Sequence, residues 1–446
     1  MPEQTTEPQT IETVGATPAR HLARGTRPGR PWRVPRQLGF VAASCSLVGV
    51  FAAAGTPIPL YNTYRAEDGI TNGDLATAGV FYFVAAALSL LVFGRLSNHL
   101  GRRPLALTAL LSAAAGCLVL TAVHSVLPFV LGRLLQGMAC GVAASGLSSY
   151  VIDCAPERPR WLPAVITGSA PMVGVPVGAL TSGALVQYGP APRVLVYTIL
   201  ATVLVLCAVI TALSPETVRR CRGALASLRP CLPVPAGAGR LFLAVGASYV
   251  GTWSLGGFYQ AFGPSLAADQ LGTTNPLVAA AVFVSVMILN PIGGPLAARL
   301  SSAASLRAGM VLFLFALTGI VFSLAVGAVI PFLMASLVVG VAQGAASTGG
   351  LRELLSAARP EDRAGLLSTI YLVAYGGTAV PGIIAGEFAR SLSSFQMAVG
   401  YAVLAAIAAV IALIAARSPR PGPAIARPRQ RPSSGSPEVR HVDHKA

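Results

Sequence analysis

The chain has 446 residues, of which 54% are hydrophobic and only 11% are charged. An ordinary soluble domain carries about 25% charged residues, so this composition excludes a typical water-soluble protein and indicates that much of the chain lies in lipid. The formal net charge of +16 is typical of proteins that bind phosphate groups. Here, however, the basic residues lie in two tails and in short loops without neighbouring base-stacking aromatics, which argues against nucleic acid as a partner.

The sequence contains no recognisable catalytic or metal-binding motif. Seven cysteines are spread through the chain with neither Cys-x-x-Cys spacing nor nearby histidines, so we expect no disulfide framework and no metal site. A Ser-His-Asp set and a phosphate-binding loop of the Gly-x-x-x-x-Gly-Lys-Ser/Thr type are also missing from the sequence. We therefore predict no catalytic residues, no cofactor and no enzymatic activity.

In chain order, the predicted elements begin with a polar, arginine-rich tail, residues 1–36, which we expect to be disordered. A helix needs about 20 apolar residues to cross a bilayer core. Runs of this kind predict twelve spanning helices, at 38–61, 75–94, 104–123, 126–152, 161–187, 193–213, 241–267, 275–298, 308–327, 329–351, 364–387 and 394–416. No charge separates the ninth span from the tenth, so that division depends on the glycine and proline within residues 326–332. A basic tail, residues 418–446, is again expected to be disordered.

The distribution of arginine predicts the orientation. Short cytoplasmic loops retain an excess of Lys and Arg. With the N-terminus inside, Arg65, Arg193 and Arg390 lie outside and Arg133 lies within a span, whereas the rest of the 32 basic residues face the cytoplasm. The sequence thus predicts a multi-pass protein of the inner or plasma membrane with both termini cytoplasmic.

A weak internal repeat divides the spans into two sets. The stretch "GMACGVAASGLSSYVIDCAPERPR" from Gly137 is similar to "GVAQGAASTGGLRELLSAARPEDR" from Gly340, and "VP" at 175–176 is repeated at 380–381. Two parallel repeats of six helices are a layout of transporters that rock one half against the other. We predict an N-terminal bundle at 37–214, a cytoplasmic linker at 215–239 and a C-terminal bundle at 240–417.

The connection between the second and third spans carries the most specific motif, "GRLSNHLGRRP" at 94–104. Six of its residues match the pattern of a known signature loop, and these are Gly94, Leu96, Gly101, Arg102, Arg103 and Pro104. With these residues, the chain resembles the major facilitator superfamily over residues 37–417, and most closely the 12-helix drug:proton antiporters of bacteria. The resemblance implies an all-α membrane fold of two six-helix halves.

The resemblance also implies a role for this loop as a gate that latches the two halves at the cytoplasmic face. Asp153, at the end of the fourth span, is the expected carboxylate partner of Arg102. Asn98 stands where the family usually has aspartate, so the full charge relay of the family is not expected here. The predicted gating residues are Gly94, Asn98, Gly101, Arg102, Arg103 and Asp153.

The fourth span contains "RLLQG" at 133–137, which is similar to a family motif associated with proton coupling. A charge inside a span is costly and by default marks a functional or paired site. Arg133, Gln136 and Gly137 are therefore candidates for proton coupling. The alternative is that the long Arg133 side chain reaches the outer headgroups and serves no coupling role.

The fifth span contains "GSAPMVGVPVGALTSG" at 168–183, which resembles the glycine- and proline-rich signature of the family's antiporters. Its core is altered here to Gly174, Pro176 and Gly178. A helix of this composition bends at proline and packs closely through glycine, as a hinge or seal requires. Helix packing without any role in transport needs the same residues.

The resemblance further implies that the substrate path is lined by the first, fourth, seventh and tenth spans and by their neighbours. Amphipathic residues on them are the candidate cavity residues Tyr249, Trp253, Tyr259, Gln260, Asn290, Gln343, Tyr371 and Tyr375. No span carries Asp or Glu at mid-depth, so this set favours an uncharged or weakly basic organic substrate. The alternative interpretation is that some of these tyrosines lie at the membrane surface as part of the aromatic belt and do not line a cavity.

The sequence favours a secondary active exporter that moves a drug or secondary metabolite against protons. The alternative is an uptake symporter or facilitator for a small nutrient, and a membrane receptor or scaffold ranks below both. The expected partners are a small-molecule substrate, protons and the lipid bilayer, with the protein acting as a monomer.

Overall fold

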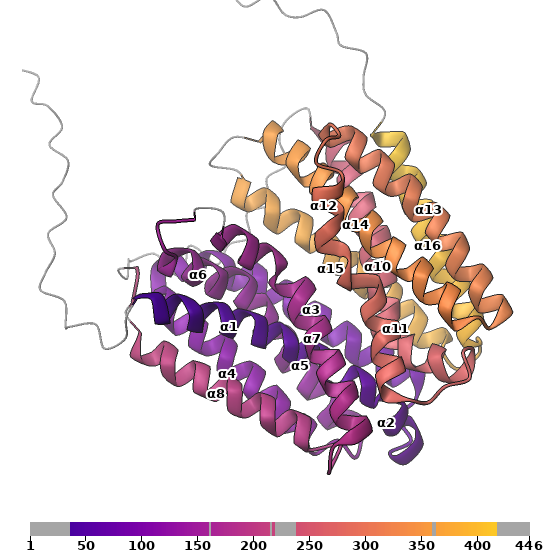
Figure 1. Ribbon diagram of the computed structural model, residues 1–446, viewed down its shortest axis with the longest axis horizontal. Coiled ribbons are helices and arrows are strands. Elements are labelled where there is room, and N and C mark those ends of the chain that lie inside the picture. Colours follow the sequence, from indigo (N-terminus) through magenta and orange to yellow (C-terminus); the bar gives the residue numbers. More distant parts are fainter. Residues whose placement is uncertain (1–35, 160–161, 215, 219–237, 359–362, 417–446) are drawn as a thin grey trace, which may run out of the picture.

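The computed structural model describes residues 36–159, 162–214, 216–218, 238–358 and 363–416. Both predicted tails and most of the predicted linker lie outside these residues. All regular structure in the described part of the chain is helical, and twelve segments are long and apolar enough to cross a membrane, as predicted. Figure 1 shows two helical bundles, one coloured indigo to magenta and the other salmon to yellow, which correspond to the two halves of the sequence.

The first bundle contains six spans, two of which are interrupted. Its elements are α1 (Arg36–Gly55), η1 (Ile58–Leu60), α2 (Tyr61–Glu67), α3 (Asn72–Leu100), α4 (Arg102–Leu120), α5 (Val126–Val142), η2 (Ala143–Leu147), α6 (Ser148–Cys154), α7 (Leu162–Tyr188) and α8 (Leu195–Leu213). The first span consists of α1, η1 and α2, and the fourth consists of α5, η2 and α6. The short η2 is π-helical, and the Ser148 hydroxyl donates to the Ala143 carbonyl five residues earlier.

The second bundle repeats this arrangement with one interruption. Its elements are α10 (Gly239–Asp269), α11 (Pro276–Ile288), α12 (Asn290–Leu296), α13 (Ser302–Val326), α14 (Val329–Ala357), α15 (Arg363–Phe388) and α16 (Ser394–Ala415). The predicted division of the ninth and tenth spans is confirmed, because Gly327 ends α13 in a left-handed conformation with φ +72°.

The repeat seen in the sequence has a structural counterpart in close helix packing. A Cβ at Gly137 of α5 would overlap the Tyr82 carbonyl of α3, and a Cβ at Gly344 of α14 would overlap the Asn290 carbonyl of α12. In both halves, therefore, glycines of the fourth helix let it approach the second helix more closely than any side chain would allow.

Hydropathy did not predict where the spans break. The predicted first span, 38–61, is continuous, whereas the helix ends at Gly55 and resumes as η1 and α2 as far as Glu67. The cause is Pro57 and Pro59, which donate no backbone hydrogen bond. The predicted eighth span, 275–298, breaks at Leu289, just before a proline at position 291.

The connection between the second and third spans, expected to be a short loop at 94–104, is mostly helical. Helix α3 continues to Leu100 and α4 begins at Arg102. Gly101 alone makes the turn, with φ +105°, a conformation that residues with a side chain rarely adopt.

Arg193 ties together the outer connections of the first bundle. Its Nη1 lies 2.8 Å from Glu67 Oε2, and its Nη2 donates to Asp68 and to the Val123 carbonyl. Burial lowers the pKa of Arg193, but the hydrogen bonds with Asp68 and Glu67 raise it further, so the net pKa lies above its ordinary value. The guanidinium therefore remains charged and holds three connections at one end of the bundle.

The two halves meet at this same, predicted outer end. Helix α3 packs against α15, and α7 packs against α11. A Cβ at Gly73 would lie 3.1 Å from the Gly386 carbonyl oxygen, and one at Gly183 would lie 3.0 Å from the Pro276 carbonyl oxygen. The backbones of these helix pairs are thus in close contact at the predicted outer end.

Polar contacts join the halves at the same level. Asn62 Nδ2 donates to the Pro264 carbonyl at 2.9 Å, and the Ser265 hydroxyl donates to the Asn72 side chain at 2.8 Å. Arg65 Nη1 lies 3.8 Å from Asp269 Oδ1. The outer end is thus closed by contacts that involve the first, second and seventh spans.

Candidate functional site

A deep chamber of about 90 Å³ lies between the two halves. The first half contributes α1, α3 and α7 to its wall, and the second half contributes α10, α11, α14 and α15. Four of the predicted cavity residues line it, and they are Trp253, Gln260, Gln343 and Tyr375. Because both halves form the wall, any motion of one half against the other changes the shape of the chamber.

A wider vestibule of about 570 Å³ continues from the chamber toward the predicted cytoplasmic end. Its wall includes Leu355, close to the end of α14, and Gly168, close to the start of α7. Predicted residues on it are Tyr249, Trp253, Asn290, Gln343 and Tyr371. Met172, Trp253 and Gln343 line both spaces and so form the neck between them. The cavity therefore faces the predicted cytoplasmic end, while the predicted outer end is closed by the contacts between the halves.

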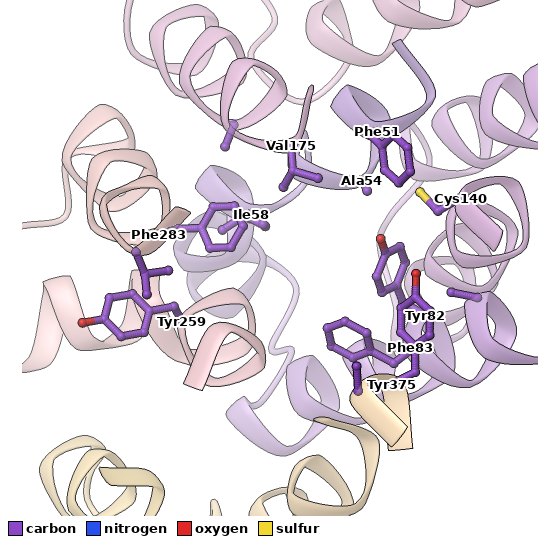
Figure 2. Close-up of a cluster of buried hydrophobic side chains, with 14 of the residues drawn as sticks. Phe51, Ala54, Ile58, Tyr82, Phe83, Cys140, Val175, Tyr259, Phe283 and Tyr375 are labelled. Atoms are coloured by element: carbon purple, nitrogen blue, oxygen red, sulfur yellow. The ribbon is translucent and has the colours of Figure 1, made fainter. Parts of the chain in front are cut away.

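An aromatic cluster forms one wall of the cavity. The Trp253 ring stacks on Tyr249 at 6.4 Å between centroids and meets Tyr375 edge-on at 5.2 Å. Phe83 of α3 lies 6.3 Å from Tyr375 across the boundary between the halves. Figure 2 shows Tyr82, Phe83 and Tyr375 gathered on one side of the close-up. This wall offers flat apolar surface to a bound molecule.

The prediction that Tyr259 lines the cavity is wrong. The Tyr259 side chain is fully buried between α10 and α14, where its hydroxyl lies 2.6 Å from Ser336 Oγ and its ring stacks on Phe332. In Figure 2 its hydroxyl points away from Tyr82 and Tyr375. Successive helical residues point about 100° apart, so Gln260 reaches the chamber and the preceding tyrosine does not.

Charge is scarce around the cavity. Among the described residues that line the chamber and the vestibule, none is Asp or Glu, and Arg352 is the one ionisable side chain that is charged at neutral pH. Arg352 is exposed and lies near the cytoplasmic end of α14. The deep part of the cavity therefore has amide and hydroxyl groups, but no carboxylate, to receive a ligand.

Arg133 is buried in the centre of the first bundle. Its exposed fraction is 0%, so its guanidinium does not reach the outer surface in this conformation. Nη1 donates to the Ala54 carbonyl and to Gln136 Oε1, both at 2.8 Å, and Gln136 Nε2 donates to the Ala53 carbonyl at 2.7 Å. The "RLLQG" motif thus binds the last turn of α1.

The position of the Arg133 charge has a physical reason. The carbonyls at a helix C-terminus lack intrahelical donors and carry a partial negative charge, which a cation stabilises. Here the prolines that end α1 expose the carbonyls of Ala53 and Ala54. The guanidinium also lies over the Tyr82 ring, 4.4 Å from its centroid, and Tyr82 lines the chamber. Arg133 Nε and Nη2 have no hydrogen-bond partner.

The three predicted hinge residues lie where α7 crosses α1. A Cβ at Gly174 would lie 2.6 Å from the Val48 carbonyl oxygen, and one at Gly178 would overlap the Ala52 carbonyl. Pro176, between them, is buried within the helix. One turn further, the Ser182 hydroxyl donates to the Thr56 carbonyl at 2.6 Å, at the break after α1.

At the predicted cytoplasmic end, the two residues predicted to pair are in contact. Arg102 Nε lies 3.2 Å from Asp153 Oδ2, which also accepts a hydrogen bond from the Thr217 hydroxyl. Gly94 and Asn98 lie in α3, but their surroundings are outside the described residues. The pairing joins the second connection of the first bundle to the fourth.

Glu216, which lies within the predicted linker, was not among the predicted gating residues but contacts them. Its carboxylate accepts hydrogen bonds from the backbone N–H groups of Arg102 at 2.7 Å and Arg103 at 3.2 Å, at the N-terminus of α4. A Cβ at Gly101 would overlap this carboxylate. An anion there is favoured by the unpaired N–H groups and by the helix dipole. The sequence signal was an acidic residue directly after the sixth span.

The apolar residues of the chamber were also missed. They include Phe51, Tyr82, Phe83, Met172, Phe283 and Met287. In a membrane helix, lipid-facing and cavity-facing positions are both apolar, so composition alone does not separate them. Pro171, beside Met172, was the available signal on α7, because a bend in a helix changes which residues face the cavity.

Twelve helices that are long and apolar enough to span a membrane, in two similar halves around a shared cavity, are typical of transporters that rock one half against the other. The particular family follows from comparison. The chain belongs to the Major Facilitator Superfamily, whose family model matches residues 22–238 and 241–442.

Two solved structures illustrate the shared fold. The nucleoside transporter NupG superimposes with a TM-score of 0.62 at 13% identity, over 86% of this chain and 98% of that chain. A bacterial homologue of the human lysosomal transporter Spinster, in an inward-facing and unoccupied conformation, gives a TM-score of 0.68 at 14% identity, over 87% and 98%. At these identities the likeness concerns the fold alone.

Proposed function

We propose that this transporter exports a small organic compound from the cytoplasm across the cell membrane and is driven by the proton gradient. The observation that supports it best is the cavity shared by both halves, which faces the predicted cytoplasmic end while the outer end is closed. A cavity of this kind is able to load substrate on one side and to release it on the other after the halves rock.

Two features support export with proton coupling. The glycine- and proline-rich segment of α7 packs directly on α1, as a seal between moving helices requires. Arg133 places a charge with two guanidinium nitrogens that lack a hydrogen-bond partner beside the break in the first span. We propose that a change in the protonation state of a group close to the Arg133 guanidinium alters the hydrogen bonds from α5 to the carbonyls of α1. This change in the α1–α5 contact would couple proton movement to transport.

Uptake of a small neutral nutrient is the second candidate. The amide groups of Gln260, Gln343 and Asn290 suit a polar uncharged solute, and NupG, which shares the fold, is a nucleoside transporter. Nucleosides are therefore included in the test below. A receptor or scaffold role ranks last, because neither needs a cavity formed by both halves.

Vesicles test direction and coupling together. The protein is reconstituted into liposomes, and the orientation is determined by protease access to the tail at 418–446. Uptake of a panel of uncharged drugs and nucleosides is measured with an imposed pH gradient and again after a protonophore. Accumulation into inside-out vesicles with an acidic interior supports export. Accumulation that does not depend on the pH gradient, or that occurs only in right-side-out vesicles, contradicts export and favours the nutrient carrier.

A further inference from the structure

We propose that the deep chamber selects a neutral, planar compound that carries a hydrogen-bond acceptor, and that Gln260 on α10 recognises this acceptor. The inference rests on the proposed function only in taking the chamber as the substrate site. The inference narrows the substrate class that the sequence predicts. The sequence pattern allows both uncharged and weakly basic compounds, whereas the structure disfavours a base that is protonated.

The charges around the chamber argue against a cation. Among the described residues that line the cavity, no carboxylate is present to pair with a positive group. Two positive charges lie beside the cavity, namely Arg352 at the vestibule and Arg133 behind the Tyr82 ring. Among the described residues, Arg133 has no carboxylate within ion-pair distance, so no negative side chain neutralises its charge. In a medium of low dielectric constant, such a field repels a cation over several ångströms.

An anion finds no direct partner in the deep chamber either. Arg133 is fully buried behind Tyr82, and Arg352 lies on the vestibule rather than on the chamber. A carboxylate or phosphate that entered the chamber would lose its hydration without gaining a guanidinium contact. The chamber therefore favours a molecule without net charge.

Gln260 supplies the polar contact. Its exposed fraction is 9%, it lines the chamber, and its Nε2 has no hydrogen-bond partner. A buried donor without an acceptor is costly, and native structures almost always satisfy such groups. A carbonyl oxygen of the substrate would satisfy it. A molecule of the same shape without an acceptor would leave the amide unpaired and would be rejected for that reason.

The shape of the chamber favours a planar ring. Trp253 and Tyr375 meet edge-on, and Phe83 extends this wall into the first bundle. Met172 and Met287 also line the chamber, and their flexible side chains adapt to a flat apolar surface. Aromatic edges and faces together are suited to stacking and edge contacts with a planar ring.

Three probes with one bicyclic ring system separate these requirements. 1-Methyl-2-quinolone is neutral and carries one carbonyl acceptor, 1-methylnaphthalene is neutral without an acceptor, and 1-methylquinolinium is a cation without an acceptor. Binding to the full-length protein in lipid nanodiscs is measured by isothermal titration calorimetry, with empty nanodiscs as the blank. We expect the quinolone to bind about three- to tenfold more tightly than either of the other probes, which reflects one hydrogen bond in a buried site.

Two variants of Gln260 test the assignment. Gln260→Leu should weaken quinolone binding by about three- to tenfold, the equivalent of one lost hydrogen bond, and leave naphthalene binding unchanged or tighter. Gln260→Glu should reverse the charge preference in favour of the quinolinium ion. Gln187→Leu, an exposed glutamine on α7, is the matched control and should bind all three probes as the unmodified protein does.

Tighter binding of the quinolinium ion to the unmodified protein, or equal quinolone binding by Gln260→Leu, would overturn the inference. Its failure is distinguishable from that of the proposed function. Selective quinolone binding without transport in either direction would reject the transport proposal and leave the site assignment standing. Proton-driven export of cations that do not compete with the quinolone would support the transport proposal and reject the site assignment.

Discussion

Arg133 is an arginine inside the membrane-spanning region whose neighbours are backbone carbonyls and an aromatic ring instead of an acid. The carbonyl of Ala54, the amide of Gln136 and the ring of Tyr82 share the stabilisation of its charge. Each of these partners lies on a different helix or at a helix end, so the guanidinium connects α1, α3 and α5. Substitution at this position tests that connection directly.

We predict that Arg133→Ala lowers gradient-driven transport by about tenfold or more. The substitution leaves the Ala54 carbonyl and Gln136 without their donor, and an unsatisfied buried polar group costs roughly 1–3 kcal/mol. The measurement is transport into vesicles together with the amount of protein in the membrane fraction. Arg299→Ala, at an exposed arginine, is the control and should retain full activity. Full transport by Arg133→Ala would remove this residue from the coupling mechanism.

At this scale, the sequence predicted side chains that a motif defines and missed those that depend on helix rotation. The contact of Arg102 with Asp153 was expected, because an arginine and a carboxylate at neighbouring helix ends pair readily. Tyr259 was placed in the cavity wrongly, since one residue shifts the direction of a side chain by about 100°. Glu216 was missed because its partners are backbone groups, which no residue pattern reveals.

At the scale of elements, the crossing of α7 and α1 is governed by glycine. Gly178 is in contact with the backbone of α1, whereas Gly168 of the same helix has no atom within 4 Å of an added Cβ. The two positions therefore offer a matched pair of substitutions with opposite expectations.

Gly178→Ala should destabilise the protein by about 1–3 kcal/mol and impair transport, because the new methyl group overlaps the Ala52 carbonyl and forces the helices apart. Gly168→Ala should be neutral or stabilising by up to about 1 kcal/mol, since alanine favours a helix over glycine. Thermal unfolding of both purified variants makes the comparison. Equal stability of the two would show that the α1–α7 contact is not tight.

The N-terminus of α4 is capped by one side chain, the carboxylate of Glu216. Glu216→Ala should lower stability by about 1 kcal/mol, as expected for the loss of a cap that accepts from two backbone N–H groups. Glu157→Ala, at an exposed glutamate in a neighbouring connection, is the control and should change the unfolding temperature little. Indistinguishable unfolding temperatures for the two variants would exclude the capping role.

The number and approximate position of the spans were predictable because lipid imposes a length and a polarity on each of them. The breaks at Thr56 and Leu289 were not, although prolines at 57, 59 and 291 marked them. Proline is common in membrane helices and often remains inside one, as Pro176 does here. Whether it ends a helix depends on neighbours that satisfy the freed carbonyls, such as Gln136 and Ser182.

At the scale of the whole molecule, closure of the outer end determines which side the cavity faces. The helix pairs α3–α15 and α7–α11 touch through glycines, while Asn62 and Arg65 add polar contacts to α10. Glycine contacts separate without leaving bulky side chains unpaired. An outward-facing state requires that these contacts open while the cytoplasmic ends come together.

A cross-link between the halves tests this requirement. Gly73→Cys combined with Gly386→Cys, in a protein whose seven native cysteines are replaced by serine, should form a disulfide between α3 and α15, because the two backbones are in contact. The oxidised protein should not transport, and a reductant should restore activity. Each single cysteine variant serves as the control. Undiminished transport by the oxidised double variant would show that the outer end does not need to open.

The π-helical η2 changes the helical register of the fourth span. It inserts one extra residue, so everything after Leu147 is turned by about 100° relative to an uninterrupted α-helix. Loss of a single residue from Ala143–Leu147 would leave Arg133 in place and swing Asp153 away from Arg102. The insertion therefore makes the two ends of one helix separately adjustable, and counting positions from one end to the other does not identify equivalent residues in a relative that lacks it.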